Sequence, residues 1–323
     1  MASYLTSDTL IESIKRRGGV PTSQSLFEDS DFLAFANEEM DIGLVPSVLQ
    51  YHEEYFVYEA EAPLTASTSR YAIPERAIGT KIRTVHYQDS NDNLFEMTRI
   101  SPDDVAFYQH SSGNHYSHYY IQNNHIVLTP DVGVSPSGSL RITYFLRPNR
   151  LVGVDEVGII TAITDTTITI DAVVTAVKEL TLSSMPSAFA TTAPCDLLEA
   201  KGGHRTKAMD LSPLSVDSTA KKVYFDPDEV PTDLVVGDHV ALAGECVIPQ
   251  LPDDLHSVLA QRVIARCVES MGDIKGLEAA NAKLGEMEAK TAGLIDNRSE
   301  GNPLKVVNLR GAFRQGRNGR RRI

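Results

Sequence analysis

The residue pairs that could carry chemistry are few and isolated in this sequence. His115 and His118 are three residues apart and offer two metal ligands. A metal site needs at least one more ligand, and on a strand this spacing points the two rings to opposite faces. Asp253 and Asp254 could act as paired carboxylates, although the start of a helix explains both acids. For each pair we favour the structural interpretation: a polar, aromatic loop or strand edge for the histidines, and a helix start for the aspartates.

Three further groups have a possible chemical use and a simpler explanation. The basic, glycine-rich segment 202–207 could hold an anion, but an exposed loop is the favoured interpretation. Tyr51, Tyr55 and Tyr58 recur at helical spacing, which is more typical of a core or a subunit interface than of a ligand site. The cysteines are odd in number and far apart, so we expect buried thiols in a reducing compartment, with no disulfide and no zinc site. They are Cys195, Cys246 and Cys267.

The common catalytic motifs are missing from the sequence. There is no Gly-x-x-x-x-Gly-Lys-Ser/Thr phosphate loop, no His-Glu-x-x-His and no Gly-x-Ser-x-Gly. We therefore predict no catalytic residue, no metal ligand and no cofactor, and we expect a protein that is not an enzyme. The enzymatic alternative is a glycan hydrolase that uses Asp253 and Asp254 as its carboxylates.

The distribution of charge is the strongest global signal. From Arg298 to Ile323 the chain has eight basic residues and one acidic residue, a net charge of +7. Because the whole chain carries −13, residues 1–297 carry −20. Such a tail cannot pack a core alone and is expected to order on a partner, either an acidic protein groove or DNA. The acidic body argues against tight binding of nucleic acid and suits a surface that DNA passes without sticking.

A helical run from Pro252 to Ile295 is the element around which the rest is arranged. Its apolar residues recur mostly at steps of three, four or seven, which is one stripe of a helix. A straight helix of this length would span roughly 60 Å, and we expect copies of the same chain to cover part of it. Gly272, Gly276 and Gly285 weaken the helix and indicate either a break near 272–273 or close approach of another backbone. The predicted oligomer interface comprises Leu255, Leu259, Met271, Leu277, Leu284 and Met287.

Two helical regions are expected at the N-terminus. Thr6–Arg17 has an apolar face and ends at Gly18-Gly19. A second region runs from about residue 25 to 59, and Pro46 should kink or split it because its ring clashes with the preceding turn.

From residue 62 the spacing of apolar residues changes from the helical period of 3.6 to every second position, which is typical of strands. In the first β region we expect strands at Lys81–Tyr87, Leu94–Ile100, Tyr116–Asn123, His125–Leu128 and Leu140–Leu146. In the second we expect β-branched runs at Val157–Ile163 and Thr166–Ile170, on either side of Thr164-Asp165, and later strands at Lys222–Phe225 and His239–Leu242. Met185–Leu214 is expected to be loop.

The fold class predicted from this order is α+β. The N- and C-terminal helices form a helical bundle, a mostly antiparallel β region is inserted between them, and an extended basic tail follows. The predicted divisions are 1–61, N-terminal helices; 62–149, first β module; 150–248, second β module; 249–295, long C-terminal helical run; and 296–323, basic tail. No apolar run is long enough for a transmembrane helix, and the first residues do not read as a secretion signal.

Three stretches carry a resemblance to a known family: Ile73–Gly79, Leu242–Pro252 and Ile295–Asn308. With the arrangement of the flanking elements they resemble the head-to-tail adaptor, or head completion, proteins of tailed bacteriophages. The resemblance spans roughly residues 20–313. It implies a helical bundle with an inserted β domain, a ring commonly of twelve copies on the portal protein, a C-terminal segment docked on the portal, and a channel that conducts the genome. The β part is larger than in the smallest adaptors, so it could contact tail, collar or fibre proteins.

The resemblance also defines the expected partners and location. They are a homo-oligomer ring, the portal protein, tail or nozzle proteins, and genomic DNA passing without sequence-specific contacts. We expect assembly in the host cytoplasm, a place in the virion neck and no membrane contact. The alternative is another tail, collar or fibre-anchoring virion protein. The predicted portal-binding residues are Leu304, Val306, Val307, Leu309, Arg310, Phe313, Arg314, Arg317, Arg320, Arg321 and Arg322.

Overall fold

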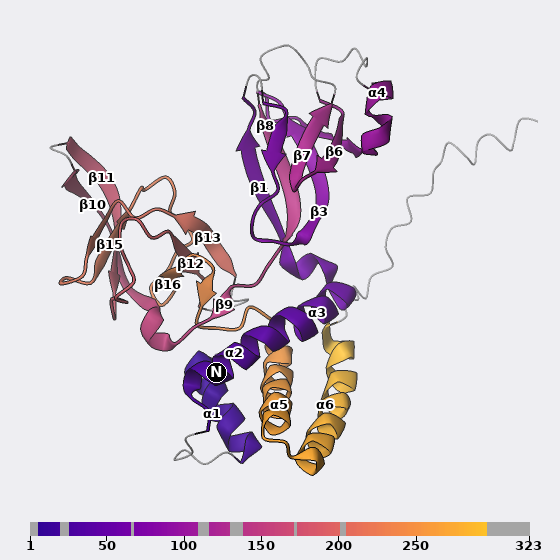
Figure 1. The fold of residues 1–323 in the computed structure, drawn as a ribbon. Helices are drawn as coiled ribbons and strands as arrows, with labels where there is room; N and C mark the ends of the chain where they lie inside the picture. Colours follow the sequence, from indigo (N-terminus) through magenta and orange to yellow (C-terminus); the bar gives the residue numbers. More distant parts are fainter. Residues whose placement is uncertain are drawn as a thin grey trace, which may run out of the picture.

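The structure is a computed structural model, and it describes residues 6–19, 26–65, 68–108, 116–129, 138–170, 173–200 and 205–295. Helices lie at both ends of the described chain, and four sheets lie between them (Figure 1). The strand pairs are antiparallel except for two short parallel pairs, β5 with β6 and β9 with β17. The expected α+β class with mostly antiparallel strands is confirmed. Within the described residues, no helix has the length and apolar character needed to span a membrane.

The first helix, α1 (Ser7–Gly18), begins and ends at residues suited to those positions. The Thr6 hydroxyl accepts a hydrogen bond from the Thr9 N–H, and Gly19 closes the helix in the left-handed conformation at φ 64°. Its apolar face, with Leu10 and Ile14 at 0% and 1% exposed, packs against α5. The Ser7 N–H also donates to the Val247 carbonyl, which joins the start of α1 to the segment before α5.

The second helical region passes Pro46 without a break. It consists of α2 (Asp29–Glu39), a π-helical turn η1 (Met40–Leu44), α3 (Val45–Tyr51) and a 3-10 turn η2 (Glu53–Phe56). The Val45 N–H donates to the Met40 carbonyl, so this turn is one residue wider than an α-helical turn. The wider turn relieves the clash that the Pro46 ring would make in a regular helix, and the expected kink is therefore a local widening.

The C-terminal run is two helices that lie side by side, and the expected straight helix of roughly 60 Å is wrong (Figure 1). α5 (Asp253–Ser270) ends where Gly272 adopts φ 73°, a conformation that favours glycine. The Asp273 carboxylate then accepts the Gly276 N–H at 3.0 Å and starts α6 (Ile274–Ile295). The break at 272–273, which the glycines indicated as one possibility, is the one that occurs.

Helices from both ends of the chain share one hydrophobic core. Most of its buried residues come from α1, α2, η1, α3 and α5, and Leu284 and Met287 of α6 pack against them. The same helices are joined by charged groups. Glu39 of α2 accepts hydrogen bonds from Arg262 at 3.0 Å and from Arg266 at 2.6 Å, and Arg262 also pairs with Glu288 of α6. α2, α5 and α6 are therefore connected by both apolar and ionic contacts.

Replacing Gly43 with alanine is expected to strain this junction of helices. A Cβ at Gly43 would lie 2.2 Å from Arg262 Nη1, so the guanidinium would have to move away from Glu39. We expect the free energy of unfolding to fall by about 1–3 kcal/mol, as for other overpacked interiors. The measurement is urea unfolding followed by circular dichroism.

Gly285→Ala is the matched control for that variant. Gly285 lies on α6, and a Cβ there would meet nothing within 4 Å. Alanine in place of this glycine should raise the free energy of unfolding by about 0.5–1 kcal/mol. If Gly43→Ala were also stabilising, the Arg262 guanidinium would be free to relocate at no cost, and its contact with Glu39 would not hold the helices together.

The first β region consists of two four-stranded sheets that share one core. The sheet orders are β1-β8-β3-β4 and β2-β7-β6-β5. Tyr144 and Ile126, one from each sheet, are 1% and 0% exposed. The strands are β1 (Val57–Pro63), β2 (Arg70–Ala72), β3 (Ala77–Gln88), β4 (Leu94–Glu96), β5 (Thr98–Arg99), β6 (His118–Gln122), β7 (His125–Thr129) and β8 (Ser139–Leu146). The 3-10 turn η3 (Pro102–Asp104) and the short helix α4 (Val105–Tyr108) follow β5.

The second β region is a seven-stranded sheet of order β13-β12-β16-β10-β11-β15-β14. Its strands are β10 (Gly158–Ile170), β11 (Val173–Leu182), β12 (Cys195–Leu198), β13 (Thr206–Leu211), β14 (Ser215–Asp217), β15 (Lys222–Phe225) and β16 (His239–Leu242). A 3-10 turn, η4 (Val154–Glu156), precedes β10, and a small parallel sheet joins β9 (Arg150–Leu151) to β17 (Glu245–Cys246).

Two expectations about the second β region are wrong. The runs 157–163 and 166–170 form one continuous strand, because Thr164-Asp165 pairs with Glu179 and Lys178 of β11 and makes no turn. The stretch Met185–Leu214 is not all loop, since it contains β12 and β13. β12 is only four residues long and all four are buried, so it has no alternating pattern to reveal it.

Candidate functional site

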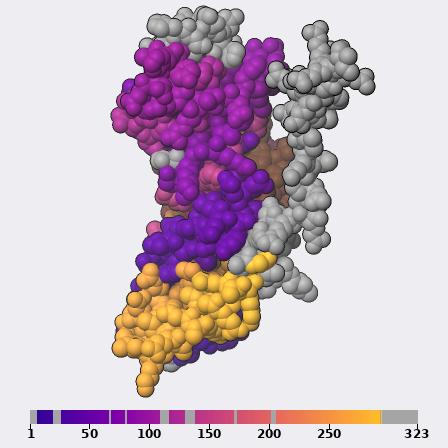
Figure 2. All heavy atoms as spheres, turned by 90° about the vertical axis from the view of Figure 1, so that its right-hand side faces the viewer, coloured from indigo at the N-terminus to yellow at the C-terminus, as the bar shows by residue number. Residues whose placement is uncertain are grey.

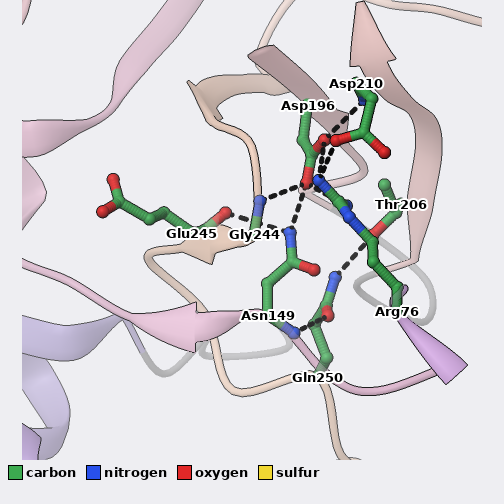
Figure 3. Close-up of polar contacts among 8 residues, drawn as sticks. All are labelled: Arg76, Asn149, Asp196, Thr206, Asp210, Gly244, Glu245 and Gln250. Atoms are coloured by element: carbon green, nitrogen blue, oxygen red, sulfur yellow. Dashed lines mark hydrogen bonds and ion pairs between the residues drawn. The ribbon is translucent and has the colours of Figure 1, made fainter. Parts of the chain in front are cut away.

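Outside the helices, the described residues form an elaborate polar cluster where the two β regions meet the segment leading to α5. We call it the polar junction (Figure 3). It draws residues from seven places in the chain: the turn before β3, the link between β8 and β9, strands β12 and β13, the link between β16 and β17, the start of β17, and the segment before α5. Its residues are Arg76, Asn149, Asp196, Thr206, Asp210, Gly244, Glu245 and Gln250.

Asp196 is the centre of the polar junction, and its side chain is 0% exposed. Arg76 donates to both carboxylate oxygens, from Nη1 to Oδ2 at 2.6 Å and from Nη2 to Oδ1 at 2.9 Å. The Asn149 amide donates to Oδ2 at 2.7 Å, and the backbone N–H groups of Gly244 and Asp210 donate at 2.9 and 3.0 Å. One buried carboxylate thus receives five hydrogen bonds, which offset the cost of burying its charge.

Arg76 is held between two carboxylates. Besides Asp196, its Nη2 donates to Asp210 Oδ1 at 2.6 Å. Burial of the guanidinium lowers its pKa, but the hydrogen bonds and charges of Asp196 and Asp210 outweigh burial and leave the pKa of Arg76 above its usual value. Arg76 therefore stays charged, and it ties the first β region to two strands of the second.

A second chain of hydrogen bonds ties both β regions to the segment before α5. The Gln250 side chain accepts the Asn149 N–H at 2.7 Å and donates to the Thr206 hydroxyl at 3.0 Å. The Asn149 amide also donates to the Glu245 carbonyl at 3.1 Å. The side chains of Asn149, Thr206 and Gln250 all have hydrogen-bond partners. The polar junction therefore fixes the two β regions and the segment before α5 against one another.

The polar junction is suited to holding the parts of the fold in position. The Asp196 carboxylate is occupied by five donors and offers no free basic oxygen, and the cluster contains no cysteine or histidine. Among the described residues, no group of three or more histidines, cysteines or acids is arranged to hold a metal ion. The arrangement suits a rigid connection between the parts of the fold.

A hollow of about 310 Å³ borders the polar junction. Arg147 and Arg150 line it together with Asp41 and Glu75, so both signs of charge face it. This mixture selects neither an anion nor a cation, and we assign no ligand to the hollow.

The predicted tyrosine stripe does not lie on one helix. Tyr51 ends α3, Tyr55 lies in η2 and Tyr58 lies in β1. Tyr58 packs edge to face on Tyr144, with ring centroids 6.1 Å apart. Tyr55 borders a hollow of about 190 Å³, and burial raises its pKa to about 12. Tyr55 and Tyr58 are half-buried and pack against the hydrophobic cores, whereas Tyr51 is 41% exposed.

The other residues considered for catalysis or metal binding have structural roles wherever they lie among the described residues. His118 lies on β6, where its Nδ1 is 2.8 Å from the Ser117 hydroxyl, while His115 lies outside the described residues. In segment 202–207, Arg205 is described and precedes β13, and Thr206 and Lys207 lie in β13. The Lys207 ammonium pairs with Asp238 at 3.0 Å, so its charge is neutralised within the protein. Asp253 and Asp254 occupy the first turn of α5, the position in which the helix dipole favours acids.

The predicted interface residues of the helical run fall into two groups. Leu255 and Leu259 are 2% and 0% exposed in the protomer's own core, so they hold α5 against α1 and α2 and are not presented to another copy. Leu284 and Met287 pack against the same core, and Leu277 is half-buried. Met271, at the turn between α5 and α6, is 45% exposed. The predicted portal-binding residues 304–322 lie outside the described residues.

The three cysteines are free, buried thiols. Burial raises the pKa of Cys195 and Cys246 to about 12 and that of Cys267 to about 11. The Cys246 thiol also donates to the Ile248 carbonyl at 2.8 Å. The expectation of small, buried, unpaired thiols is confirmed.

These thiols predict a loss of stability in alkali. The unfolded chain releases their protons near the ordinary thiol pKa of 9.0, whereas the folded chain keeps them to about pH 11 or 12. The contribution of these thiols should therefore be constant below pH 9 and be lost as the pH rises above it, each thiol contributing up to about 1.4 kcal/mol per pH unit. Urea unfolding at pH 8, 9 and 10 measures this, and Cys246→Ala should make the fall shallower. A free energy of unfolding that is flat from pH 8 to pH 10 would contradict the assignment.

Two of the stretches that carry the resemblance to phage adaptors meet at the polar junction. Ile73–Gly79 supplies Arg76, and Leu242–Pro252 supplies Gly244, Glu245 and Gln250. These two stretches thus supply residues that connect the parts of the fold. Residues 5–177, more than half of the chain, match the family model described as SU10 adaptor protein.

The chain belongs to the SU10 adaptor protein family.

Members of this family are structural proteins of bacteriophages and do not form an enzyme class, so the chain is a component of the virion. None of the curated proteins matches it. The matched region contains α1, α2, α3 and the first β region and ends within β11. α5 lies beyond the match but packs on α1 and α2 within it.

Sequence reasoning did not identify Arg76, Asn149 and Asp196 as a cluster. Asn149 and Arg76 are 47 and 120 residues from Asp196, so no local spacing could reveal their contact. The one signal was indirect, since Arg76 lies within a stretch that resembles the family.

Proposed function

We propose that this SU10 adaptor is a head-to-tail adaptor: several copies form a ring below the portal, connect the capsid to the tail and line the channel for DNA. The match of residues 5–177 to the adaptor family carries the proposal. The charge of the chain supports it, because a body of −20 does not hold DNA that passes along it. The site of action is the neck of the virion.

Each part of the chain has a role in this proposal. The helices form the wall of the ring, with Met271, Leu277, Leu284 and Met287 as the proposed contacts that remain after Leu255 and Leu259 are assigned to the protomer's core. The tail from residue 304 anchors the ring, with Leu304–Leu309 added as a strand to an edge of the portal and the arginines paired with portal acids or DNA phosphates.

The shape of the described molecule agrees with a connecting role. The first β region and the α5–α6 pair lie at opposite ends of the molecule (Figure 2). A protein with separate surfaces at its two ends can contact two different partners at once. The polar junction keeps these ends in a fixed relation, which a connector between capsid and tail requires.

Co-sedimentation of the purified protein with the portal ring of the same phage tests the proposal. Electron-microscope class averages of the pelleted material would reveal a ring of this protein stacked on the portal, and its symmetry would give the number of copies. Failure to pellet with the portal, at protein concentrations well above micromolar, would refute the head-to-tail role.

A second candidate function is that of another tail, collar or fibre-anchoring virion protein. The observation in its favour is the extent of β structure, since two β regions occupy the chain from Val57 to Cys246. Such a protein needs no affinity for the portal. Free trimers or sixfold rings that ignore the portal would favour this candidate over the first.

A further inference from the structure

The helical run from α2 to η2 presents exposed apolar side chains on its outer side. In this run the exposed positions Glu38, Ile42, Pro46 and Gln50 recur at steps of four, which places them along one side of the helices. Ile42 is 67% exposed, and Tyr51 at the end of α3 is 41% exposed. We call this surface the helix face, and its exposed residues are Glu38, Asp41, Ile42, Pro46, Gln50, Tyr51 and Glu53.

The segment that supplies the helix face is acidic. From residue 26 to 56 the chain has eight acids and no lysine or arginine. Bases from other elements pair with four of these acids, which are Asp29, Glu38, Glu39 and Glu54. Asp41 borders the hollow that Arg147 and Arg150 line, but like Glu53 it forms no ion pair with any described residue. Asp41 and Glu53 each lie within two residues of an exposed apolar side chain, so the helix face combines apolar contact area with negative charge.

The basic tail begins beside the helix face. The last turns of α6 lie next to α3 (Figure 1), and α6 ends at Ile295. The tail from Arg298 onward has a net charge of +7. An extended chain covers about 3.3 Å per residue, so the segment from Ile295 to Leu309 reaches as far as about 45 Å. The helix face is about 22 Å long at the helical rise of about 1.5 Å per residue, so all of it lies within reach of the tail.

The apolar residues of the tail match the spacing of those on the helix face. Ile42 and Tyr51 are about 13 Å apart along the helices, from the helical rise. Leu309 and Phe313 are also about 13 Å apart in an extended chain. In the tail each of these apolar residues is followed directly by an arginine, as the exposed apolar residues of the helix face have an acid close by.

Charge and tethering select the occupant of the helix face. An acidic surface repels DNA and the acidic body of a second copy, whereas it attracts a basic segment. The tail of the same chain is held near the helix face by its covalent link, and such a link gives an effective concentration in the millimolar range. The tail of another copy has no such advantage.

We propose that the tail of this chain docks on its own helix face. In the docked state the two apolar residues of segment 309–314 contact Ile42 and Tyr51. Its two arginines lie beside Asp41 and Glu53. Because exposed ion pairs are weak and are screened by salt, docking is an equilibrium that salt reverses and that adds little to the stability of the body.

The docking does not depend on the proposed function, but its consequence rests on it. A docked tail has to leave the helix face before it anchors the ring on the portal. Free copies therefore hold their portal-binding segment against their own body, and the portal competes for it.

A tryptophan in the tail of the full chain reports on docking, because the chain contains no other tryptophan. The reporter is Phe313→Trp, which keeps an aromatic ring at this position. Quenching of its fluorescence by acrylamide measures how far the ring is exposed. We expect the quenching constant to rise at least about twofold between about 20 mM and about 500 mM NaCl, since salt weakens the attraction between the tail and the helix face.

Variants of the helix face are made in the same reporter chain. Asp41→Lys with Glu53→Lys should give strong quenching at low salt. Asp41→Asn with Glu53→Gln keeps the shapes of the side chains, so it should give an intermediate value even if the lysines disturb the fold. The matched control is Asp228→Lys with Glu229→Lys, at two exposed acids between β15 and β16. It changes the net charge equally and should leave the quenching weak.

Three results would overturn the proposal. The first is equal quenching at low salt in the reporter chain and in both variants of the helix face. The second is an equal loss of protection in the matched control, which would indicate attraction to the whole body and not to this surface. The third is protection that grows with protein concentration, because the tail would then be docked on another copy.

Co-sedimentation with the portal ring separates this inference from the proposed function. At low salt, the lysine variant of the helix face should bind the portal about threefold more tightly than the matched control, as expected if about a third of the tails are free in the control. A tail that is protected in a protein that never binds the portal would refute the head-to-tail role and retain the docking. Portal binding by a chain whose tryptophan is fully exposed at low salt would retain the role and refute the docking.

Discussion

Arg76→Ala is expected to lower the free energy of unfolding by about 3–5 kcal/mol, because it leaves the Asp196 carboxylate charged, 0% exposed and without its counter-ion. The remaining donors, Asn149 and two backbone N–H groups, are dipoles and cannot replace a full positive charge. Urea unfolding followed by circular dichroism and by tyrosine fluorescence measures the change, since the chain contains no tryptophan. A separate early transition of one β region is expected in this variant, because the polar junction no longer holds it.

Asp210→Asn is the matched control for Arg76→Ala. Asp210 also pairs with Arg76, but its side chain is 59% exposed, and exposed pairs contribute about 0–1 kcal/mol. Asparagine keeps the shape and tolerates the backbone at φ 57°. Arg76→Lys should fall between the two, because one ammonium cannot make the paired contacts of the guanidinium. If Arg76→Ala were no more destabilising than Asp210→Asn, the polar junction would not be a main source of stability.

Deletion of residues 304–323 is expected to leave the body folded and abolish binding to the portal. The deletion removes seven basic residues and changes the net charge from −13 to −20. If each contributes about 0.5 kcal/mol, the loss is about 3.5 kcal/mol, or about 300-fold in affinity. The body should unfold as in the full chain, because a segment of this basic, glycine-rich composition cannot pack a core alone. Co-sedimentation with the portal ring over a concentration series measures the affinity.

A tail in which Arg310, Arg314, Arg317, Arg320, Arg321 and Arg322 are all lysine is the control for charge. It keeps the net charge of the chain but cannot make bidentate contacts with carboxylates or phosphates. Weak binding by this variant would indicate paired contacts on the portal, and full binding would indicate charge alone. Unchanged affinity of the truncated protein would refute the anchoring role of the tail.

The sequence predicted the elements that local pattern and turn chemistry define. The hairpin between β6 and β7 was expected at Asn123-Asn124, and both residues adopt positive φ, 49° and 59°, which asparagine tolerates better than most. β15 and β16 have the predicted bounds, and β8 begins one residue early. In these cases the signal lies within a few residues of the element itself.

The sequence did not predict features that depend on distant partners. β10 continues through Thr164-Asp165 because β11 pairs with it there, and the pairing of Asp165 with Lys178 compensates for an acid in a strand. An apolar stripe on a helix also does not indicate whether the same chain or another molecule covers it. Leu255 and Leu259 are buried by their own chain, whereas Met271 is exposed. The polar junction depends on contacts across 47 and 120 residues, beyond the range of any local pattern.

Each β region ends close in space to the point where it begins. In the first, Val57 at the start of β1 pairs with Phe145 near the end of β8. In the second, Arg150 and Leu151 pair with Glu245 and Cys246. Insertions whose ends are adjacent can be removed or exchanged without moving the elements that flank them. Recombination between phage genomes can therefore replace a β region together with its partners at the polar junction, while the helices keep their own packing.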